Sequence, residues 1–300
     1  MANPKLALIP SGYNVAEVYS VLPSDGTADF LFDRTGSATR VREDGLIETV
    51  LNDVPRLDWL NSNCPNLLLE AQSTNNHTYS ESNVNKSFTG VTLTNNQAVS
   101  PSGEYNAMEV KEDTSTGKHK FSTNSFSIIN SVKYTLSMFV KKNSDNRFIF
   151  INAGEALGVS GSFNLDTQAV TGGVKIINNY GNDWYRIGIT ATASSTQNEF
   201  IYIQMQEGII DEAYTGDESS VFVWGLQFEQ SAGVVNLATS YIPNLATGST
   251  TRQSETCSVT TPSGVSQIVE TFSDNTTNTI TTIPTTYNVS NGRIKKVIMT

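Results

Sequence analysis

The chain has 300 residues, of which 38% are hydrophobic and only 16% are charged, and its formal net charge is −10. This composition suits one large β domain or two modest ones, and the abundance of Thr, Ser and Asn favours strands and turns over helices. The negative charge opposes nucleic-acid binding, which depends on Lys and Arg contacts with phosphates, and no apolar run reaches the roughly 20 residues of a membrane-spanning helix.

Residues 1–60 are expected to form an arm with few strands of its own. Pro23 and the Ser-Asp-Gly turn at 24–26 interrupt this region. The run "ADFLFDR" places Phe30 and Phe32 on one face and predicts a half-buried strand, whereas "GLIETVL" does not separate apolar from polar positions. The start "MANPKLALIP" lacks the pattern of a signal peptide, so we expect folding in a cytoplasm.

Residues 61–252 carry the pattern of an all-β sandwich or jelly roll. "NLLLEA" predicts a buried strand, and a series of short extended runs follows, separated by Gly, Asn, Asp and Ser clusters. These runs are "YTLSMFVKK", "RFIFINAG", "GSFNLD", "GGVKIIN", "DWYRIGITATA", "EFIYIQMQ" and "VFVWGLQFEQ".

Alternation within these runs predicts which residues are buried. In "EFIYIQMQ", Ile201, Ile203 and Met205 form an aliphatic face that must be core, opposite Tyr202. In "VFVWGLQFEQ", strict alternation places Trp224 in an apolar row, which favours a core residue over a ligand platform.

Residues 253–300 change character and are rich in Thr and Ser. Asn291-Gly292 lies between two extended runs and predicts a β-hairpin. Because few bulky residues occur here, we expect a β-ribbon that takes its hydrophobic cover from the sandwich or from another copy of the chain.

A series of segments resembles a known family. In order, from residue 7 to residue 252, they are "ALIPSGYNVAEVYSVLPSDGTADFLFDR", "SATRVREDGLIETV", "VPRLDW", "CPNLLLEAQSTN" with "YSE", "WYRIGIT", "VWGLQFEQ", "ATSYIPN" and "TR". Together they resemble bacteriophage head-fibre, head-spike and tail-fibre proteins with a concanavalin A-like or carbohydrate-binding-module-like sandwich. The chain departs from the family at Ala71, where Pro is more common, and at Ser73, where Arg is more common.

The resemblance implies a non-enzymatic structural subunit of a virion that assembles in the host cytoplasm. It implies a head fibre or spike with an attachment arm at 1–60, a lectin-like sandwich at 61–252 and an oligomer contact at 253–300. Its partners would be other virion structural proteins and host-surface carbohydrate, and the subunit would form a homotrimer. The alternatives are a tail-fibre receptor-binding protein, a capsular polysaccharide depolymerase and a bacterial surface adhesin.

The candidate carbohydrate-binding residues are Asn182, Trp184, Tyr185 and Arg186. Alternation places Trp184 on the same face as a cation, so this face is expected to be the more exposed one. An aromatic ring beside amide and guanidinium groups offers a sugar both stacking and hydrogen bonds. Core packing of the same aromatic residues is the alternative.

The acidic residues Asp211, Glu212, Asp217 and Glu218 lie in the loop-like run "IIDEAYTGDESS". Hydrolysis of a glycoside requires two carboxylates on either side of the bond. In such a loop, solvated carboxylates or a calcium site are commoner outcomes. We therefore expect no catalytic site and no cofactor, with calcium as the one alternative.

The remaining reactive side chains do not form a recognisable site. His77 and His119 lack ligand spacing, so zinc is not expected and both are predicted at the surface. Cys64 and Cys257 are expected to be reduced packing residues. A polar cluster of Glu70, Gln72, Asn75 and Arg252 is predicted to pin the N-terminal segment to the sandwich through salt bridges.

Overall fold

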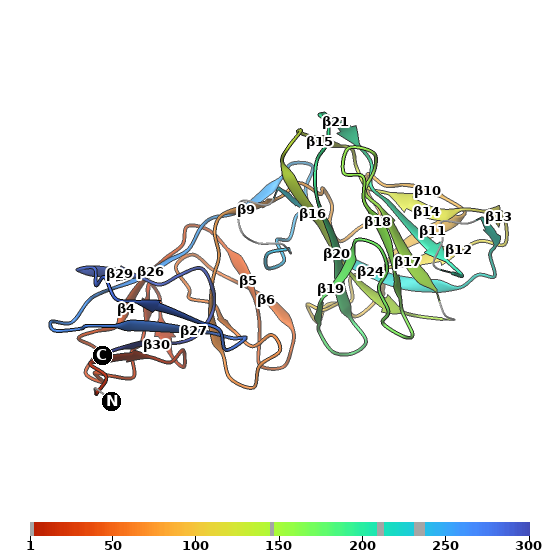
Figure 1. Ribbon diagram of the computed structural model, residues 1–300. Coiled ribbons are helices and arrows are strands. Elements are labelled where there is room, and N and C mark those ends of the chain that lie inside the picture. The colour runs from red at the N-terminus through yellow and green to blue at the C-terminus, as the bar shows by residue number, and fades with distance from the viewer. Residues whose placement is uncertain (1–2, 145–146, 209–212, 231–237) are drawn as a thin grey trace. The chain divides into compact units, whose positions relative to one another are not determined.

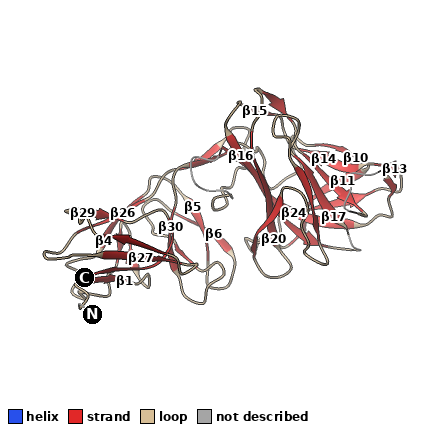
Figure 2. Ribbon diagram, in the orientation of Figure 1, coloured by secondary structure: helices blue, strands red, loops and turns tan. Residues whose placement is uncertain are grey.

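The computed structural model describes residues 3–144, 147–208, 213–230 and 238–300. Within these ranges the regular elements are all strands, which confirms the all-β prediction (Figure 2). No helix capable of spanning a membrane occurs among the described residues. The chain divides into two compact units, one made of Met1–Gln72 with Arg252–Thr300 and the other of Ser73–Thr251.

The second unit contains two main antiparallel sheets. The eight-stranded sheet has the order β11-β12-β24-β16-β20-β19, with β9 on β24 and β25 on β9, and these strands span Val91–Ala98, Ala107–Glu112, Ser220–Gln230, Lys133–Lys142, Tyr185–Thr192, Val174–Asn179, Ser73–Asn75 and Thr250–Arg252. The five-stranded sheet has the order β10-β14-β22-β17-β18, which span Ser87–Thr89, His119–Ser122, Tyr202–Gln206, Phe148–Asn152 and Ser160–Asn164. The second unit also contains two short strand pairs: β13 (Thr116–Gly117) with β23 (Tyr214–Thr215), and β15 (Phe126–Ile128) with β21 (Gln197–Glu199).

One hydrophobic core lies between the two sheets of this unit. It takes Leu136 and Met138 from β16 of the larger sheet and Ile203 and Met205 from β22 of the smaller one. Each strand thus directs alternate side chains inward, as a sandwich requires. The predicted aliphatic core face of "EFIYIQMQ" is confirmed, and so is the sandwich fold.

Trp224 is fully buried, as predicted, but on the other face of its strand. In the ladder between β16 and β24, Phe139 lies opposite Trp224 and Ser137 lies opposite Gln227, so Met138 faces two residues. This β-bulge includes Gly225 at φ +62° and shifts the alternation by one position. Trp224 therefore points away from the inter-sheet core, whereas Leu226 and Phe228, after the bulge, point into it.

The first unit is built from both ends of the chain. One sheet has the order β28-β27-β30-β8-β7 with β1 also on β30, and these strands span Thr277–Ile280, Ile268–Phe272, Gly292–Met299, Asn66–Leu69, Leu57–Asp58 and Leu6–Leu8. A second sheet has the order β2-β3-β4-β26-β29, spanning Tyr13–Asn14, Glu17–Val18, Phe30–Asp33, Thr256–Thr260 and Thr286–Asn288. A hairpin joins β5 (Ala38–Val41) to β6 (Ile47–Val50). Figure 1 shows C-terminal strands (blue) among N-terminal ones (red).

This arrangement differs from the expected three-part division at residues 60 and 252. The first 60 residues contribute seven strands, β1 to β7, rather than an arm with few strands. The C-terminal segment takes its cover from the N-terminal segment, because Phe30 and Leu67 share a core with Ile268 and Val297. Neither another copy nor the sandwich is needed to bury these residues.

The hairpin predicted at Asn291-Gly292 is wrong. Strand β29, before this dipeptide, pairs with β26, whereas β30, after it, pairs with β27. The dipeptide therefore joins two different sheets. Gly292 has φ +140°, and an added Cβ would come within 3.0 Å of the Phe272 ring, so backbone freedom and close packing both require glycine.

A buried ion cluster joins the two halves of the first unit. The Glu255 carboxylate lies 2.9 Å from Nη1 of Arg34 and accepts a 2.7 Å hydrogen bond from Nε of Arg56. Arg56 also contacts the Glu70 carboxylate at 2.9 Å, and Arg252 lies 3.5 Å from this Glu70 carboxylate. The predicted Glu70–Arg252 contact is present, whereas Gln72 is exposed and Asn75 hydrogen-bonds within the second unit.

Replacing Glu255 with Gln should destabilise the first unit strongly. The change keeps the shape but leaves two buried guanidinium groups without their shared carboxylate, which costs roughly 3 to 5 kcal/mol. Urea unfolding measures the loss in the free energy of unfolding, and hydrogen exchange of the first unit's amides shows whether the loss lies in that unit. Glu43→Gln, at an exposed position, is the control and should behave as the unchanged protein; equal stability of the two variants would contradict the role of the cluster.

Both histidines are buried, so their predicted surface placement is wrong. His119 contacts the carbonyl oxygen of Gly90 at 2.7 Å and packs against Tyr214. Burial lowers the pKa of His77 well below its usual value, and the nearby Lys86 adds to this effect. Lys86 is itself buried, with its ammonium group donating to the carbonyl oxygens of Tyr79 and Ser82.

Lys86 should make the stability of the second unit depend on pH. Burial lowers the pKa of Lys86 from 10.5 to about 7. Between these values the unfolded chain holds the proton that the folded chain releases, so the free energy of unfolding rises with pH, by up to about 1.4 kcal/mol per unit. Unfolding titrations should show a flatter profile for Lys86→Met than for the exposed control Lys175→Met. Identical profiles would contradict this assignment.

Candidate functional site

Three of the four predicted sugar-binding residues are buried. Trp184 is 3% exposed, and its Nε1 donates to the carbonyl oxygen of Val99. Tyr185 belongs to the inter-sheet core. Arg186 donates from Nη1 to Thr239 at 2.7 Å. The expectation that Trp184 and Arg186 lie on an exposed face is therefore wrong, and of the four only Asn182 is exposed.

A cover segment, residues 238–244, buries Arg186 and the neighbouring Trp224. Tyr241 packs against Trp224 with ring centroids 4.5 Å apart. The backbone N–H of Ile242 donates to Oε1 of Gln227 at 2.7 Å, and the hydroxyl of Thr239 donates to Glu229 at 2.5 Å. The outward side of the eight-stranded sheet is therefore filled by protein over these residues.

The outward side of the five-stranded sheet differs, and we call it the open face. Its residues alternate with core residues along each strand and lie in rows across the sheet, as the pairing register shows. One row runs Ser122, Tyr202, Asn152 and Ser160, and the next runs Lys120, Gln204, Phe150 and Ser162. Ser160 is exposed and Tyr202, Asn152 and Lys120 are half-buried, whereas the other four are buried.

Aromatic rings lie among the polar groups of the open face. Phe200 is 46% exposed and precedes β22, two residues before the half-buried Tyr202. Phe148 is also half-buried, whereas Phe150, which lies diagonally from Tyr202 on the neighbouring strand, is buried. The ammonium group of Lys120 lies 4.2 Å from the centre of the Tyr202 ring, a cation–π contact.

One end of the open face is hollowed. This hollow has a volume of about 510 Å³, within the usual range for small-molecule sites. It is lined by Tyr202, Asn152 and Ser160 from the sheet, by the loop 154–159, and by Glu199. A ring, an amide, a hydroxyl and a carboxylate therefore border the same space.

Glu199 holds the loop that borders the hollow. Its Oε1 accepts hydrogen bonds from the backbone N–H of Ala156 at 2.6 Å and from Gln197 at 2.5 Å. Gly154 has φ +85°, and an added Cβ would come within 2.4 Å of Oε2 of Glu199. Glycine at this position thus lets the loop approach the carboxylate.

The acidic loop does not assemble a metal site in the described residues. Asp217 pairs with Arg147 at 2.6 Å and Glu218 pairs with Lys111 at 3.1 Å, while Asp211 and Glu212 lie outside the described residues. No group of three or more His, Cys, Asp or Glu side chains within the described ranges is placed to hold a metal ion. Cys64 and Cys257 are both free thiols, as predicted, but Cys64 is exposed.

The sequence pattern contains the residues of the open face, but no site is predicted there from the sequence. In "EFIYIQMQ" the aliphatic residues are core, so Phe200 and Tyr202 had to point outward beside Gln204. An aromatic and polar face opposite a core face was the available signal. Glu199 and the loop at 154–159 carried no such signal, because their approach depends on the fold.

Comparison with known proteins finds similar solved structures. No protein-family model matches the chain, and no curated protein sequence matches it. The tailspike protein 4 enzymatically active domain of bacteriophage CBA120 has 13% identity and a TM-score of 0.34, with 51% of this chain and 21% of that chain covered. The xylan-binding domain CBM22-1 of Paenibacillus barcinonensis Xyn10C has 11% identity and a TM-score of 0.31, covering 54% and 94%.

A third similar structure is TmCBM61, solved in complex with β-1,4-galactotriose. It has 10% identity and a TM-score of 0.33, with 52% of this chain and 99% of that chain covered. This chain thus spans about a fifth of the tailspike structure and almost all of the two smaller modules. At these identities and TM-scores the likeness does not identify a ligand, and the fold assignment rests on the chain's own sheets.

Proposed function

We propose that the chain is a glycan-binding structural subunit of a bacteriophage virion, a head fibre or spike. The open face carries the binding proposal, because the accessible rings of Phe200 and Tyr202 lie near the Asn152 amide, the Ser160 hydroxyl and the Lys120 ammonium group. Aromatic rings pack against the CH groups of a sugar, and the polar groups fix its orientation.

The shape of the face favours a chain of sugars over a single unit. The accessible residues Tyr202, Asn152 and Ser160 lie in one row on three neighbouring strands, each about 4.8 Å from the next. The hollow beside Glu199 gives one end of this track a deeper contact. Affinity at one such shallow site would be weak, and display in many copies would raise it through avidity.

The virion role rests on the sequence resemblance. Head-fibre, spike and tail-fibre proteins share the ordered segments of this chain, and assembly inside the host cytoplasm agrees with its free thiols. The proposed partners are other virion structural proteins and host-surface carbohydrate, and the proposed assembly is a homotrimer. Attachment would use the first unit, which holds the N-terminal segment; a tail-fibre receptor-binding protein is the alternative placement.

A polysaccharide depolymerase is the second candidate, because Glu155 and Glu199 border the same hollow. Hydrolysis needs one carboxyl group to donate a proton and the other to act as nucleophile or base. Glu199 instead accepts a hydrogen bond from the backbone N–H of Ala156, which fixes the loop, and another from Gln197 on its own strand. We therefore propose binding without hydrolysis.

Loss of the Tyr202 ring should weaken glycan binding. We expect Tyr202→Ala and Phe200→Ala each to lower the affinity for host polysaccharide by about tenfold, measured by calorimetry, because each removes a stacking surface. Phe88→Ala is the matched control, since Phe88 is 53% exposed on the same sheet but lies in register with the core residue Phe121. Unchanged binding in Tyr202→Ala would reject the open face, and release of reducing ends would favour the depolymerase.

Electron microscopy of phage particles tests the virion role. Gold-labelled antibody raised against this chain should mark the capsid surface in a regular pattern. Labelling of the tail would favour the alternative placement, and unlabelled particles with the chain free in the lysate would contradict a structural role.

A further inference from the structure

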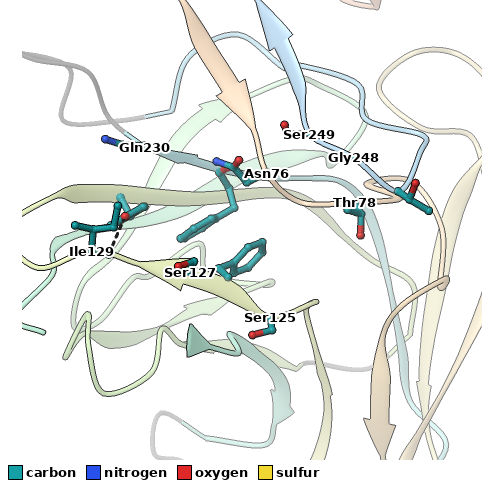
Figure 3. A pocket seen from close by; sticks show the side chains of 12 residues that line it. Asn76, Thr78, Ser125, Ser127, Ile129, Gln230, Gly248 and Ser249 are labelled. Carbon is teal, nitrogen blue, oxygen red and sulfur yellow. Dashed lines mark hydrogen bonds between the residues drawn. The ribbon is translucent and has the colours of Figure 1, made fainter. Parts of the chain in front are cut away.

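The second unit contains another pocket, separate from the open face, which we call the β15 pocket. Its volume is about 370 Å³. It is lined by Ser127 and its neighbours in the segment 125–129, by residues of β16 and β24, and by two segments that flank the sandwich, 76–78 and 247–249. Figure 3 shows Asn76, Thr78, Ser127 and Ser249 arranged around this space.

Stacked aromatic rings form the apolar side of the β15 pocket. The Phe126 and Phe228 rings stack with centroids 4.0 Å apart, and the Tyr134 ring stacks on Phe228 at 5.4 Å. The Tyr134 hydroxyl also accepts a hydrogen bond from the backbone N–H of Ile129 at 3.0 Å, drawn in Figure 3. These contacts hold the apolar side rigid. The three rings are 1 to 4% exposed and belong to the inter-sheet core, so the accessible apolar surface at the rim is that of Ile129, which is 51% exposed.

Uncharged polar groups form the other sides. The hydroxyls of Ser125, Ser127 and Ser249 are exposed, and within the described part of the chain they have no hydrogen-bond partner from the protein. The Asn76 amide makes only a long contact, 3.4 Å, with the carbonyl oxygen of Phe228. Donors and acceptors from separate segments are thus available to a bound molecule.

None of the residues that line the β15 pocket is charged. An anionic ligand would lose its hydration without gaining a cation, and this penalty disfavours carboxylates and phosphates. A purely apolar ligand would leave the surrounding hydroxyls and amides unpaired. The chemistry that fits both walls is an uncharged ring with one CH-rich side and several hydroxyl groups.

We propose that the β15 pocket is a second binding site, specific for a single uncharged pyranose unit of a glycan. This inference stands on different residues from the open face and does not depend on it. The open face would follow a sugar chain, whereas the β15 pocket would hold one neutral ring. Two sites of different selectivity on one sandwich would let the protein recognise two features of the same polysaccharide.

The test uses the full chain and a panel of glucose, galactose, mannose, N-acetylglucosamine and glucuronic acid. We expect at least one neutral sugar to shift the NMR signals of the amides in segment 125–129, and glucuronic acid to bind at least about tenfold more weakly, because it is charged. The proposal is overturned if no neutral sugar shifts these amides or if glucuronic acid binds equally well.

Blocking variants complete the test. Ser127→Trp should fill the pocket and abolish the shifts, and Ser249→Trp, from another segment, should do the same if the first variant fails to fold. Thr94→Trp, at an exposed mid-strand position of β11, is the control. Tyr202→Ala should keep the shifts while losing polysaccharide binding, so failure of either site is seen separately. Shifts that persist in the folded blocking variants would place the sugar elsewhere.

Discussion

The buried carboxylate of Glu255 is the constraint on which the first unit depends. A carboxylate without solvent needs cationic partners, and Arg34 and Arg56 supply them from a part of the chain some two hundred residues away in sequence. The chain must therefore return to its starting unit after forming the sandwich. Glu70 and Arg252, which flank the sandwich in sequence, belong to the same cluster, so the sandwich is an insertion between two members of one ion-pair network.

The two segments that enter and leave the sandwich are fastened to its larger sheet. The Asn75 amide donates to the carbonyl oxygens of Leu226 and Ile242, and its Oδ1 accepts from the backbone N–H of Phe228. The Thr74 and Thr251 hydroxyls bond to each other at 2.7 Å. These contacts and the cover segment close the outward side of the eight-stranded sheet, so the proposed binding site lies on the five-stranded sheet.

This division of roles changes the interpretation of the segments that resemble phage fibre and spike proteins. Their polar and aromatic residues build the buried ion cluster or hold the cover segment, as Arg56 and Arg186 do. These segments therefore indicate how the sandwich is inserted into the first unit, and they do not indicate which ligand is bound. The residues of the proposed glycan site, such as Tyr202, lie outside those segments.

The sequence by itself determined the strands and the core of the sandwich, because alternation in runs such as Ile201 to Met205 follows directly from the pleat of a strand. It could not determine which outward face stays open. That depends on residues 238–244 covering Trp224 and on the bulge at Gly225, which reverses the alternation halfway along β24. Contacts between residues far apart in the chain leave no local periodic signal, so only the tertiary structure decided that Trp184 is buried and Tyr202 accessible.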